Sequence, residues 1–420
     1  MHLNRRLFAF ASAASLSVAM DGIAAGRTDT SRLEGMLIGS LIGDALGGPI
    51  EFLSTDRVRE VMPGARGWNK AKRLDAETIA ELADSLAMES YETLRPTTAP
   101  YGPWKRNAPR GTITDDSRHK IVLMRAIQAM LRGQRSEFSA EDLARAFIAF
   151  RPRLKGTLDD ELTTLVEQGL REYRFAARWL LGERDPDMAL PVERLWAGIS
   201  NCSGQMALLP LAGIFAGEPE QAYRATYRVD FIDAPIARDI VSAINAGLAA
   251  ALGSGSDDQS MLERWTLLLD TMRETDPLRM RDVPFAGRPL DRWLDLSDSI
   301  ASRADGRPAK AYELLETEGK PVYWWDAHFT LLVPLTMLKL CRFNPLAAMH
   351  LTLDFGHDTD SYAQVLGALA GAVHGKDIFP ESMRTAVSER LTADYGESID
   401  DWMNTLNQAA IRRQEAIAKE

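Results

Sequence analysis

The sequence predicts an all-α protein. Apolar residues recur at intervals of three, four and seven along most of the chain, as they do on one face of an α-helix; Leu123, Ala126, Ile127 and Met130 form one such set. The alternation and β-branched enrichment that indicate strands are nearly absent. Hydrophobic residues make up 45% of the 420 residues and charged residues 26%, which excludes a disordered or fibrous chain.

Charge and cysteine content exclude further classes. The formal net charge is -10, which argues against a nucleic-acid partner because such binding needs a positive surface. The two cysteines, Cys202 and Cys341, are too few for a disulfide scaffold or a cysteine-rich zinc module. They could pair with each other in an exported protein, or remain as two buried thiols. The length allows two or three domains, or one large helical domain.

Residues 1–26 are typical of an export signal. Arg5 and Arg6 precede an apolar and small-residue run that ends at Met20, and Ala24 and Ala25 suit a cleavage site. The paired arginines indicate a twin-arginine signal, and hence a periplasmic or secreted protein. The alternative is a frayed N-terminal helix on a cytoplasmic protein. No later segment has eighteen uninterrupted apolar residues, so we expect no membrane insertion after signal removal.

A glycine-spaced helix comes next, over 31–52. Gly35, Gly39, Gly43 and Gly47 share one helical face, although glycine disfavours a helix by about 1 kcal/mol relative to alanine. Such a stripe predicts a neighbouring backbone that approaches very closely. A second small-residue face contains Ala363, Gly367, Ala370 and Gly371. The two faces are typical of two tightly packed core helices.

The rest of the chain alternates predicted helices and loops. A charged helical piece lies around 70–90 and is followed by a Pro- and Gly-rich loop over 94–111. Apolar spacing predicts helices after Asp116 and at 141–150, 159–181, 235–252, 259–273, 327–342 and 360–374. We expect loops near 183–192, 274–291 and 303–310.

Two acidic clusters open predicted helices. The first is Thr114-Asp115-Asp116-Ser117 and the second is Asp358-Thr359-Asp360-Ser361. Each cluster alone is typical of helix N-capping, which needs a single acceptor oxygen. Together they offer four carboxylates, which repel one another unless protons or cations intervene. Oxygen ligands without His or Cys favour Mg²⁺, Mn²⁺ or Ca²⁺ over zinc. Two ions about 3.5–4 Å apart would neutralise the set and polarise a bound water.

Three segments carry a family resemblance. GSLIGDALGGPIEF, TDDS and GHDTDSYAQVLGALAGAVHG resemble, in this order, the signature blocks of the ADP-ribosylglycohydrolases, and they span residues 39–375. The resemblance implies a single domain over 27–420, an orthogonal all-α bundle with two magnesium ions. It also implies hydrolysis at C1 of the terminal ribose in an ADP-ribosylated protein or a small ADP-ribosyl conjugate. The stretch at about 53–111 would be a long insertion relative to the family's compact form.

The resemblance also implies a set of site residues. The metal ligands would be Thr114, Asp115, Asp116, Asp358, Asp360 and Ser361. Glu51 would lie near the substrate ribose, and Asp44 would be structural. Glu51, Asp116 or Asp360 could activate water or protonate the leaving group at an oxocarbenium-like transition state, with acid and base unassigned.

Substrate contacts are implied in the middle block and at one departure from the pattern. SNCSGQMALLPLAGIFAG resembles the segment that lines the ADP-ribose pocket, which makes Asn201, Ser203 and Gly204 candidate substrate contacts. His357 replaces a glycine and could contact a phosphate or leaving group, or simply pack. Asp230 lies near where many members have a histidine.

Aromatic and histidine side chains elsewhere have simpler interpretations. The insertion contains Trp68, Tyr101 and Trp104, and the Trp104 ring could stack on adenine or anchor a loop. His328 and His350 fall in apolar stretches and are interpreted as structural.

Two alternatives stand beside the hydrolase. One is a catalytically inactive relative that binds nucleotides or serves a structural role. The other is a secreted carbohydrate hydrolase of the helical-toroid type, for which the sequence supplies no specific motif.

Overall fold

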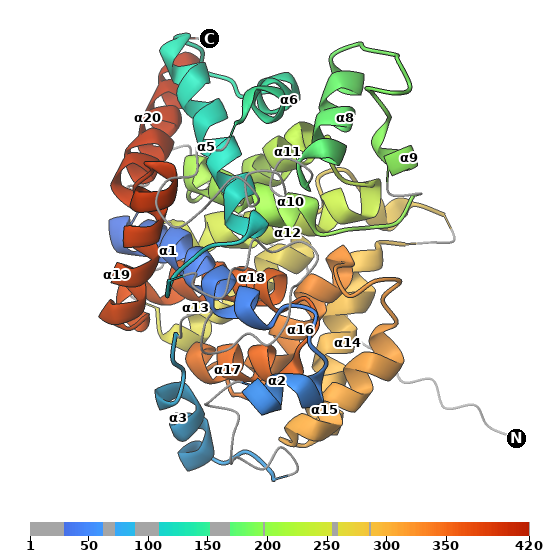
Figure 1. The fold of residues 1–420 in the computed structure, drawn as a ribbon, viewed down its shortest axis with the longest axis vertical. Helices are drawn as coiled ribbons and strands as arrows, with labels where there is room; N and C mark the ends of the chain where they lie inside the picture. The colour runs from blue at the N-terminus through green and yellow to red at the C-terminus, as the bar shows by residue number, and fades with distance from the viewer. Residues whose placement is uncertain are drawn as a thin grey trace, which may run out of the picture.

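The structure is a computed structural model that describes residues 29–61, 72–88, 109–151, 169–195, 198–253, 259–284 and 287–419. The predicted export signal at 1–26 lies outside the described residues, as do Trp68, Tyr101 and Trp104 of the predicted insertion. Every regular element in the described part of the chain is a helix, which confirms the predicted all-α class (Figure 1).

The helices follow one another with short connections. From the N-terminal side, the α-helices are α1 (Thr30–Gly47), α2 (Thr55–Val61), α3 (Ala76–Asp84), α5 (Asp115–Arg132), α6 (Ala140–Ala149), α8 (Arg171–Leu180), α9 (Val192–Leu195), α10 (Ser203–Ala207), α11 (Pro219–Val229) and α12 (Pro235–Leu252). They continue as α13 (Met261–Glu274), α14 (Pro289–Ala304), α15 (Pro308–Leu314), α16 (Ala327–Leu340), α17 (Pro345–Phe355), α18 (Thr359–His374), α19 (Glu381–Arg390) and α20 (Ile399–Ile417). Shorter 3₁₀ or π segments are η1 (Gly48–Ile50), η3 (Leu209–Phe215), η5 (Met280–Asp282), η6 (Leu315–Gly319), η7 (Lys376–Ile378) and η8 (Leu391–Tyr395).

Apolar spacing located several helices correctly. The predicted stretches that became α6, α12, α13, α16 and α18 agree with the structure within two residues at each end. The predicted loop at 274–291 is partly wrong, because it contains η5 and the start of α14, and the loop at 303–310 is too long. The reason is that Pro289 and Pro308 occupy the first helical position, where proline starts a helix rather than ending one.

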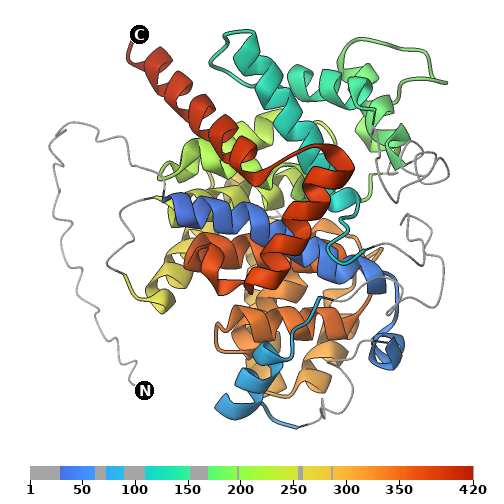
Figure 2. The same cartoon turned by 60° about the vertical axis from the view of Figure 1, so that its left-hand side comes forward.

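The centre of the molecule is the pair α1 and α18, which pack backbone to backbone. Figure 2 shows α1, in blue, crossing the middle of the molecule. A Cβ atom added at Gly43 would lie 2.0 Å from the Ala363 carbonyl oxygen, and one at Gly371 would lie 1.9 Å from the Gly35 carbonyl oxygen. Because no side chain fits between the backbones, the predicted close packing of the two small-residue faces is confirmed.

The glycine contacts also fix the direction of this pair. Gly35 meets Gly371 and Gly39 meets Gly367, while Gly47 meets the backbone of Asp360. The two helices are therefore antiparallel. The C-terminal end of α1 is held against the first turn of α18, so the residue that follows η1 is brought next to the second acidic cluster.

One described helix, α12, is long and apolar enough by length and composition to cross a membrane. Most of this helix is buried inside the structure, with side chains such as Ile240, Ile244 and Leu248 fully covered. Its apolar character is therefore explained by its place in the protein core.

Candidate functional site

Four segments meet at one site. They are the residues after η1, the start of α5, the turn between α17 and α18, and the turn before α10. The Ser361 hydroxyl donates to Oδ2 of Asp116 at 3.4 Å, which joins the two acidic clusters directly. The structure thus brings together Thr114–Ser117 and Asp358–Ser361, which are far apart in the sequence.

The first cluster is fixed by Asp44. Its carboxylate accepts from the backbone N–H of Thr114 at 3.0 Å and from that of Ser117 at 3.1 Å. The Thr114 hydroxyl accepts from the backbone N–H of Asp116, as an N-cap residue does. The structural role expected for Asp44 is therefore observed, and the Asp115 and Asp116 carboxylates are not needed for capping.

The second cluster begins at a left-handed turn. Gly356 and His357 have φ values of 83° and 66°, and a Cβ at Gly356 would lie 2.4 Å from the Leu53 carbonyl oxygen. The backbone of His357 is paired on both sides, since its N–H donates to Leu53 O and its carbonyl accepts from Phe52 N–H. This pairing ties the turn to the segment that carries Glu51.

Side-chain bonds within the second cluster leave its carboxylates available. Asp358 stands at the N-cap position of α18 but caps no backbone N–H. The Thr359 hydroxyl donates to Gly47 O at 2.8 Å, and Oδ1 of Asp360 accepts from the backbone N–H of Ser361 at 3.0 Å. Capping therefore does not explain why Asp358 is an aspartate.

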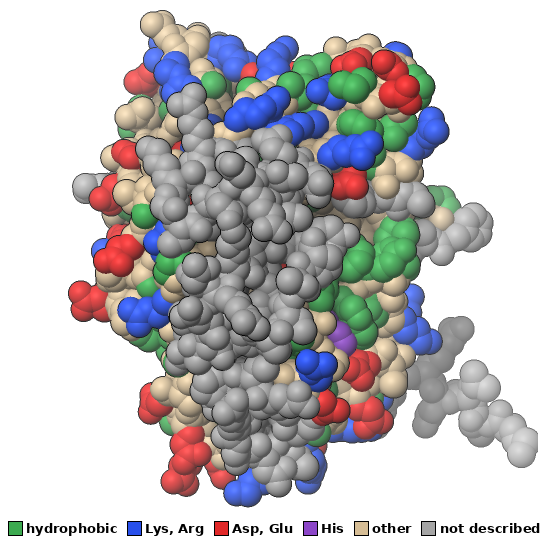
Figure 3. All heavy atoms as spheres, in the orientation of Figure 1, with side chains coloured by type: hydrophobic (Ala, Val, Ile, Leu, Met, Phe, Trp, Pro, Cys, Tyr) green, Lys and Arg blue, Asp and Glu red, His purple; other side chains and the backbone are tan. Residues whose placement is uncertain are grey.

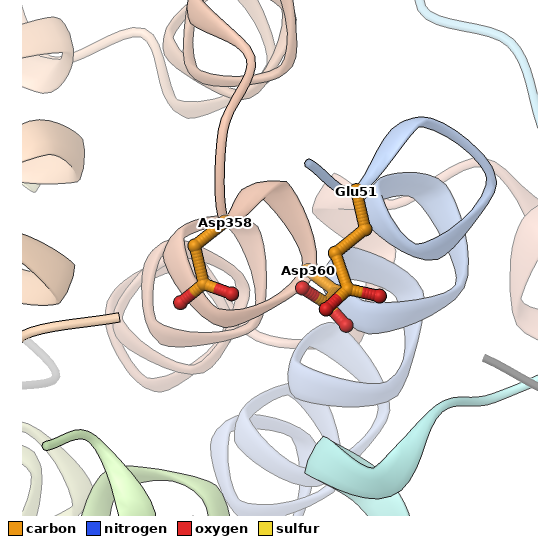
Figure 4. Close-up of side chains that lie close together, drawn as sticks. All are labelled: Glu51, Asp358 and Asp360. Carbon is orange, nitrogen blue, oxygen red and sulfur yellow. The ribbon is translucent and has the colours of Figure 1, made fainter. Parts of the chain in front are cut away.

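Glu51 completes the acidic group (Figure 4). Glu51, Asp358 and Asp360 place carboxylate oxygens within 4.8 Å of one another, and so do Asp115, Asp116 and Asp360. Asp360 belongs to both sets. Glu51, Asp116, Asp358 and Asp360 each keep one buried carboxylate oxygen without a hydrogen-bond partner: Oε2, Oδ1, Oδ2 and Oδ2, respectively.

Burial and mutual repulsion raise the pKa values of these carboxyl groups. The pKa of Glu51 is well above its ordinary value because of burial first and the charges of Asp360 and Asp115 next. Burial, followed by the neighbouring carboxylates, likewise raises the pKa of Asp116, Asp358 and Asp360 far above the usual range. Such a group is unfavourable as a set of bare anions.

The donor set fits hard divalent cations. Buried carboxylate oxygens without partners, from residues that converge on one space, are the ligands that Mg²⁺ and Mn²⁺ prefer. The sharing of Asp360 between two sets of three carboxylates is suited to two ions. Two of the predicted ligands, Thr114 and Ser361, add hydroxyl oxygens at the same place.

We expect Asp358→Asn to stabilise the metal-free protein at pH 7.5 by about 1 kcal/mol or more. A carboxyl group with a raised pKa contributes stability that is present below its ordinary value of 3.8 and is lost as the pH rises through its folded-state pKa. The gain should therefore vanish near pH 4.5. Urea unfolding in EDTA at the two pH values measures the difference.

The exposed loop residue Asp187 provides the control for this substitution. Asp187→Asn should leave the free energy of unfolding unchanged at both pH values. If Asp358→Asn were less stable than the natural protein at pH 7.5 in EDTA, the repulsion account would be wrong.

A pocket of about 150 Å³ opens in front of the carboxylates. Its lining residues come from five segments and are Glu51, Phe52, Asp115, Asp116, Gly169, Glu172, Tyr173, Asn201, Cys202, Ser203, Met206, Trp325, Asp358 and Ser361. Asp360 is 1% exposed and is not among them. Of the three predicted catalytic residues, Glu51 and Asp116 therefore face the pocket and Asp360 lies behind them.

Two of the four predicted substrate contacts reach this pocket. Asn201 and Ser203 line it, and Nδ2 of Asn201 is buried without a partner. The Oδ1 atom of Asn201 accepts from the backbone N–H of Ser203 at 3.0 Å, which fixes the amide so that its NH₂ group stays available. Asn201 is therefore well placed to donate to a ligand.

Gly204 and His357 do not line the pocket. The backbone N–H of Gly204 donates to Asp233 at 2.9 Å, and a Cβ there would lie 2.5 Å from the Asp233 carboxylate. The His357 ring stacks on Trp324 at 3.6 Å between centroids, and its Nε2 lies 3.4 Å from Glu316. Both residues shape the site from behind, which for His357 agrees with the packing alternative.

A buried carboxyl pair supports the Asn201–Gly204 turn. Asp230 accepts from the backbone N–H groups of Ile232 and Asp233, while Asp233 accepts from that of Gly204. Burial raises the pKa of Asp230 to about 6 and that of Asp233 well above its ordinary value. Asp230, at the position flagged in the sequence, thus acts on the pocket through Asp233 and Gly204.

Several pocket residues had no signal in the sequence. Tyr173 and Glu172 come from α8, far from every motif, and the Tyr173 hydroxyl lies 3.0 Å from that of Ser203. Phe52 and Trp325 form an edge-to-face pair at 5.9 Å. Figure 3 shows hydrophobic side chains gathered on the right-hand side of one face, and Val322 and Tyr323 are 64% and 45% exposed.

The cysteines and the remaining histidines are structural. Cys202 and Cys341 are both buried and free, so the disulfide considered above is not formed. His350 is fully buried, with Nδ1 3.1 Å from the Ser85 hydroxyl, and His328 stacks on Trp293.

Comparison with known proteins gives consistent findings. A model of the ADP-ribosylglycohydrolase family matches residues 26–417 of this chain. A solved chain of an "ADP-ribosylglycohydrolase-related protein complex" aligns with a TM-score of 0.50 and 17% sequence identity, over 91% of this chain and 98% of that one. At this identity the likeness concerns the fold alone. A search of curated proteins found no match.

Proposed function

We propose, because the chain belongs to the ADP-ribosylglycohydrolase family, that it is a magnesium-dependent hydrolase that cleaves the glycosidic bond at C1 of a terminal ribose. The observation that carries the proposal is the convergence of Glu51, Asp116, Asp358 and Asp360, each with an unpartnered buried oxygen, on one pocket. Neither a structural nor a capping role needs that arrangement.

The proposed ion ligands are the carboxylates of Asp115, Asp116, Asp358 and Asp360 with the hydroxyls of Thr114 and Ser361. Glu51 lies close enough to Asp358 and Asp360 to join them. When bound, divalent ions would neutralise this cluster, orient the ribose hydroxyls and lower the pKa of an attacking water. Mg²⁺ is the first choice for an all-oxygen set, and Mn²⁺ is a substitute with similar ligand preferences.

The pocket carboxylates supply the proton transfers in this proposal. Hydrolysis at an anomeric carbon commonly uses two carboxyl groups, one to protonate the leaving group and one to activate water. Glu51 and Asp116 are the predicted catalytic residues that line the pocket, whereas Asp360 supports them from behind. The raised pKa of Glu51 suits it to hold a proton before the reaction.

The substrate proposed is an ADP-ribosylated protein or a small ADP-ribosyl conjugate. The carboxylate end of the pocket accepts the ribose, and the buried amide of Asn201 can donate to its hydroxyl or phosphate oxygens. The side of the pocket that carries Phe52, Glu172 and Trp325 remains for the other parts of the substrate. If residues 1–26 direct export, the substrate is extracytoplasmic.

Hydrolysis assays with and without metal test the function. Purified protein should release ADP-ribose from ADP-ribosyl-arginine or an ADP-ribosyl-serine peptide in Mg²⁺, and EDTA should remove the activity reversibly. Asp116→Ala should be inactive while it keeps the helical circular dichroism spectrum. Tight ADP-ribose binding without product would favour the inactive relative instead, and activity unaffected by EDTA would rule out the metal mechanism.

A further inference from the structure

A lysine is buried directly behind the acidic site. Lys120 lies one helical turn after Asp116 on α5 and is 1% exposed. Its Nζ atom donates to the Asp116 carbonyl oxygen at 3.0 Å and to Oε1 of Gln364 on α18 at 2.6 Å. The ammonium group therefore sits between the two helices whose first turns carry the acidic clusters.

A hydrogen-bond network fixes the orientation of Gln364. Its Oε1 also accepts from the Ser40 hydroxyl of α1 at 3.1 Å, and its Nε2 donates to Gln205 O of α10 at 3.1 Å. Because both ends of the amide are engaged, the oxygen must face Lys120. The lysine has a defined place rather than a choice of positions.

The surroundings of Lys120 are strongly negative. Burial of an ammonium ion is unfavourable by several kcal/mol unless opposite charges offset it. The acidic neighbours that interact with it are Asp116, Asp44 and Asp360. Within the described residues, however, no carboxylate oxygen lies within 4.0 Å of Nζ, because its direct acceptors are a carbonyl and an amide oxygen. Lys120 thus acts on the carboxylates through space and leaves their oxygens available.

We propose that Lys120 is a resident counter-cation of the acidic site, and that its charge lowers the affinity of the site for divalent ions. The inference rests on the metal site of the proposed function. A fixed positive charge behind Asp116 and Asp360 offsets part of the negative potential that attracts an incoming cation. It also repels that cation across a region from which water is excluded. A lysine that only filled space would have neither effect.

Calorimetric titration with Mg²⁺ at pH 7 tests the proposal. Lys120→Met removes the charge and keeps a long unbranched side chain. The expected dissociation constant is roughly tenfold lower than that of the natural protein. Because tighter binding stabilises the folded state more, saturating Mg²⁺ should also raise the Tm of the variant by more than it raises that of the natural protein.

The chain offers a matched control in Lys339 on α16. This lysine is also largely buried, but its Nζ bonds Asp298 and Ser297, away from the acidic site. Lys339→Met should leave the Mg²⁺ affinity and the Mg²⁺-induced Tm shift unchanged. Lys120→Gln is the second variant if Lys120→Met does not fold, and the same tightening is expected.

The outcomes separate the two levels of the argument. Unchanged or weaker Mg²⁺ binding by both Lys120 variants, with normal binding by the natural protein, would overturn the role of Lys120 and leave the metal site intact. Absence of Mg²⁺ and Mn²⁺ binding in the natural protein would overturn both the proposed metal site and this inference.

Discussion

Asp360→Asn is expected to remove both hydrolysis and divalent-ion binding. Asp360 is the one residue that belongs to both sets of three carboxylates, so its loss weakens both sets together. We expect kcat/KM to fall by about a thousandfold or more, which corresponds to about 4 kcal/mol of transition-state stabilisation. ADP-ribose release and calorimetric titration with Mg²⁺ measure the two effects.

The fold of this variant should survive. Asparagine keeps an oxygen that can accept from the backbone N–H of Ser361, as Oδ1 of Asp360 does. Removal of one charge also relieves repulsion with Asp358 and Asp44. Asp187→Asn on an exposed loop is the control and should match the natural protein. A variant at position 360 that still bound two ions and kept a tenth of the activity would refute this assignment.

Gly371→Ala is expected to have the largest effect on stability. The new Cβ would lie 1.9 Å from the carbonyl oxygen of Gly35 and 2.1 Å from its carbonyl carbon. Both atoms are backbone, so the clash cannot be relieved by a change of rotamer, and α1 and α18 must separate. We expect a loss of about 3 kcal/mol or more in the free energy of unfolding, measured with urea.

Gly133→Ala provides the comparison. Gly133 ends α5 with φ of -75°, and a Cβ there would meet its nearest neighbour at 3.4 Å, an ordinary contact. Its cost should stay below about 1 kcal/mol. Because the close packing of α1 and α18 also holds Glu51 beside Asp360, any folded Gly371→Ala protein should bind Mg²⁺ more weakly. Equal stability of the two alanine variants would contradict the packing account.

The core of the fold could be predicted because its signals are local. The glycine spacing of α1 and the small-residue face of α18 required a close backbone contact, and that contact is observed. Helix α17 was not predicted because it is apolar on nearly every side, which leaves no polar face to set a period. Helix α20 was not predicted either, although Ser398 is an N-cap residue with an acidic first turn.

The site was predictable only where its residues stand in clusters. Two hydroxyl-carboxylate clusters marked the starts of α5 and α18, and the structure brings them together. Tyr173 and Glu172 reach the pocket from α8, and Lys120 enters it from behind. These contributions depend on how distant helices pack, which no spacing in the sequence records.

The positions of His357 and Gly204 illustrate a different limit. The adjacency of His357 to Asp358 suggested a contact with substrate, but its left-handed backbone turns the ring onto Trp324. Gly204 is next to pocket residue Ser203, yet its neighbour is the Asp233 carboxylate behind the turn. Residues adjacent in sequence can face opposite sides of a turn, and only the backbone conformation decides which.

A crystal structure with Mn²⁺, located by its anomalous scattering, tests the central claim most directly. We predict strong peaks within coordination distance of Asp360, one beside Asp115 and Asp116 and one beside Glu51 and Asp358. Peaks elsewhere on the surface, or none at saturating Mn²⁺, would show that the converging carboxylates do not form a metal centre.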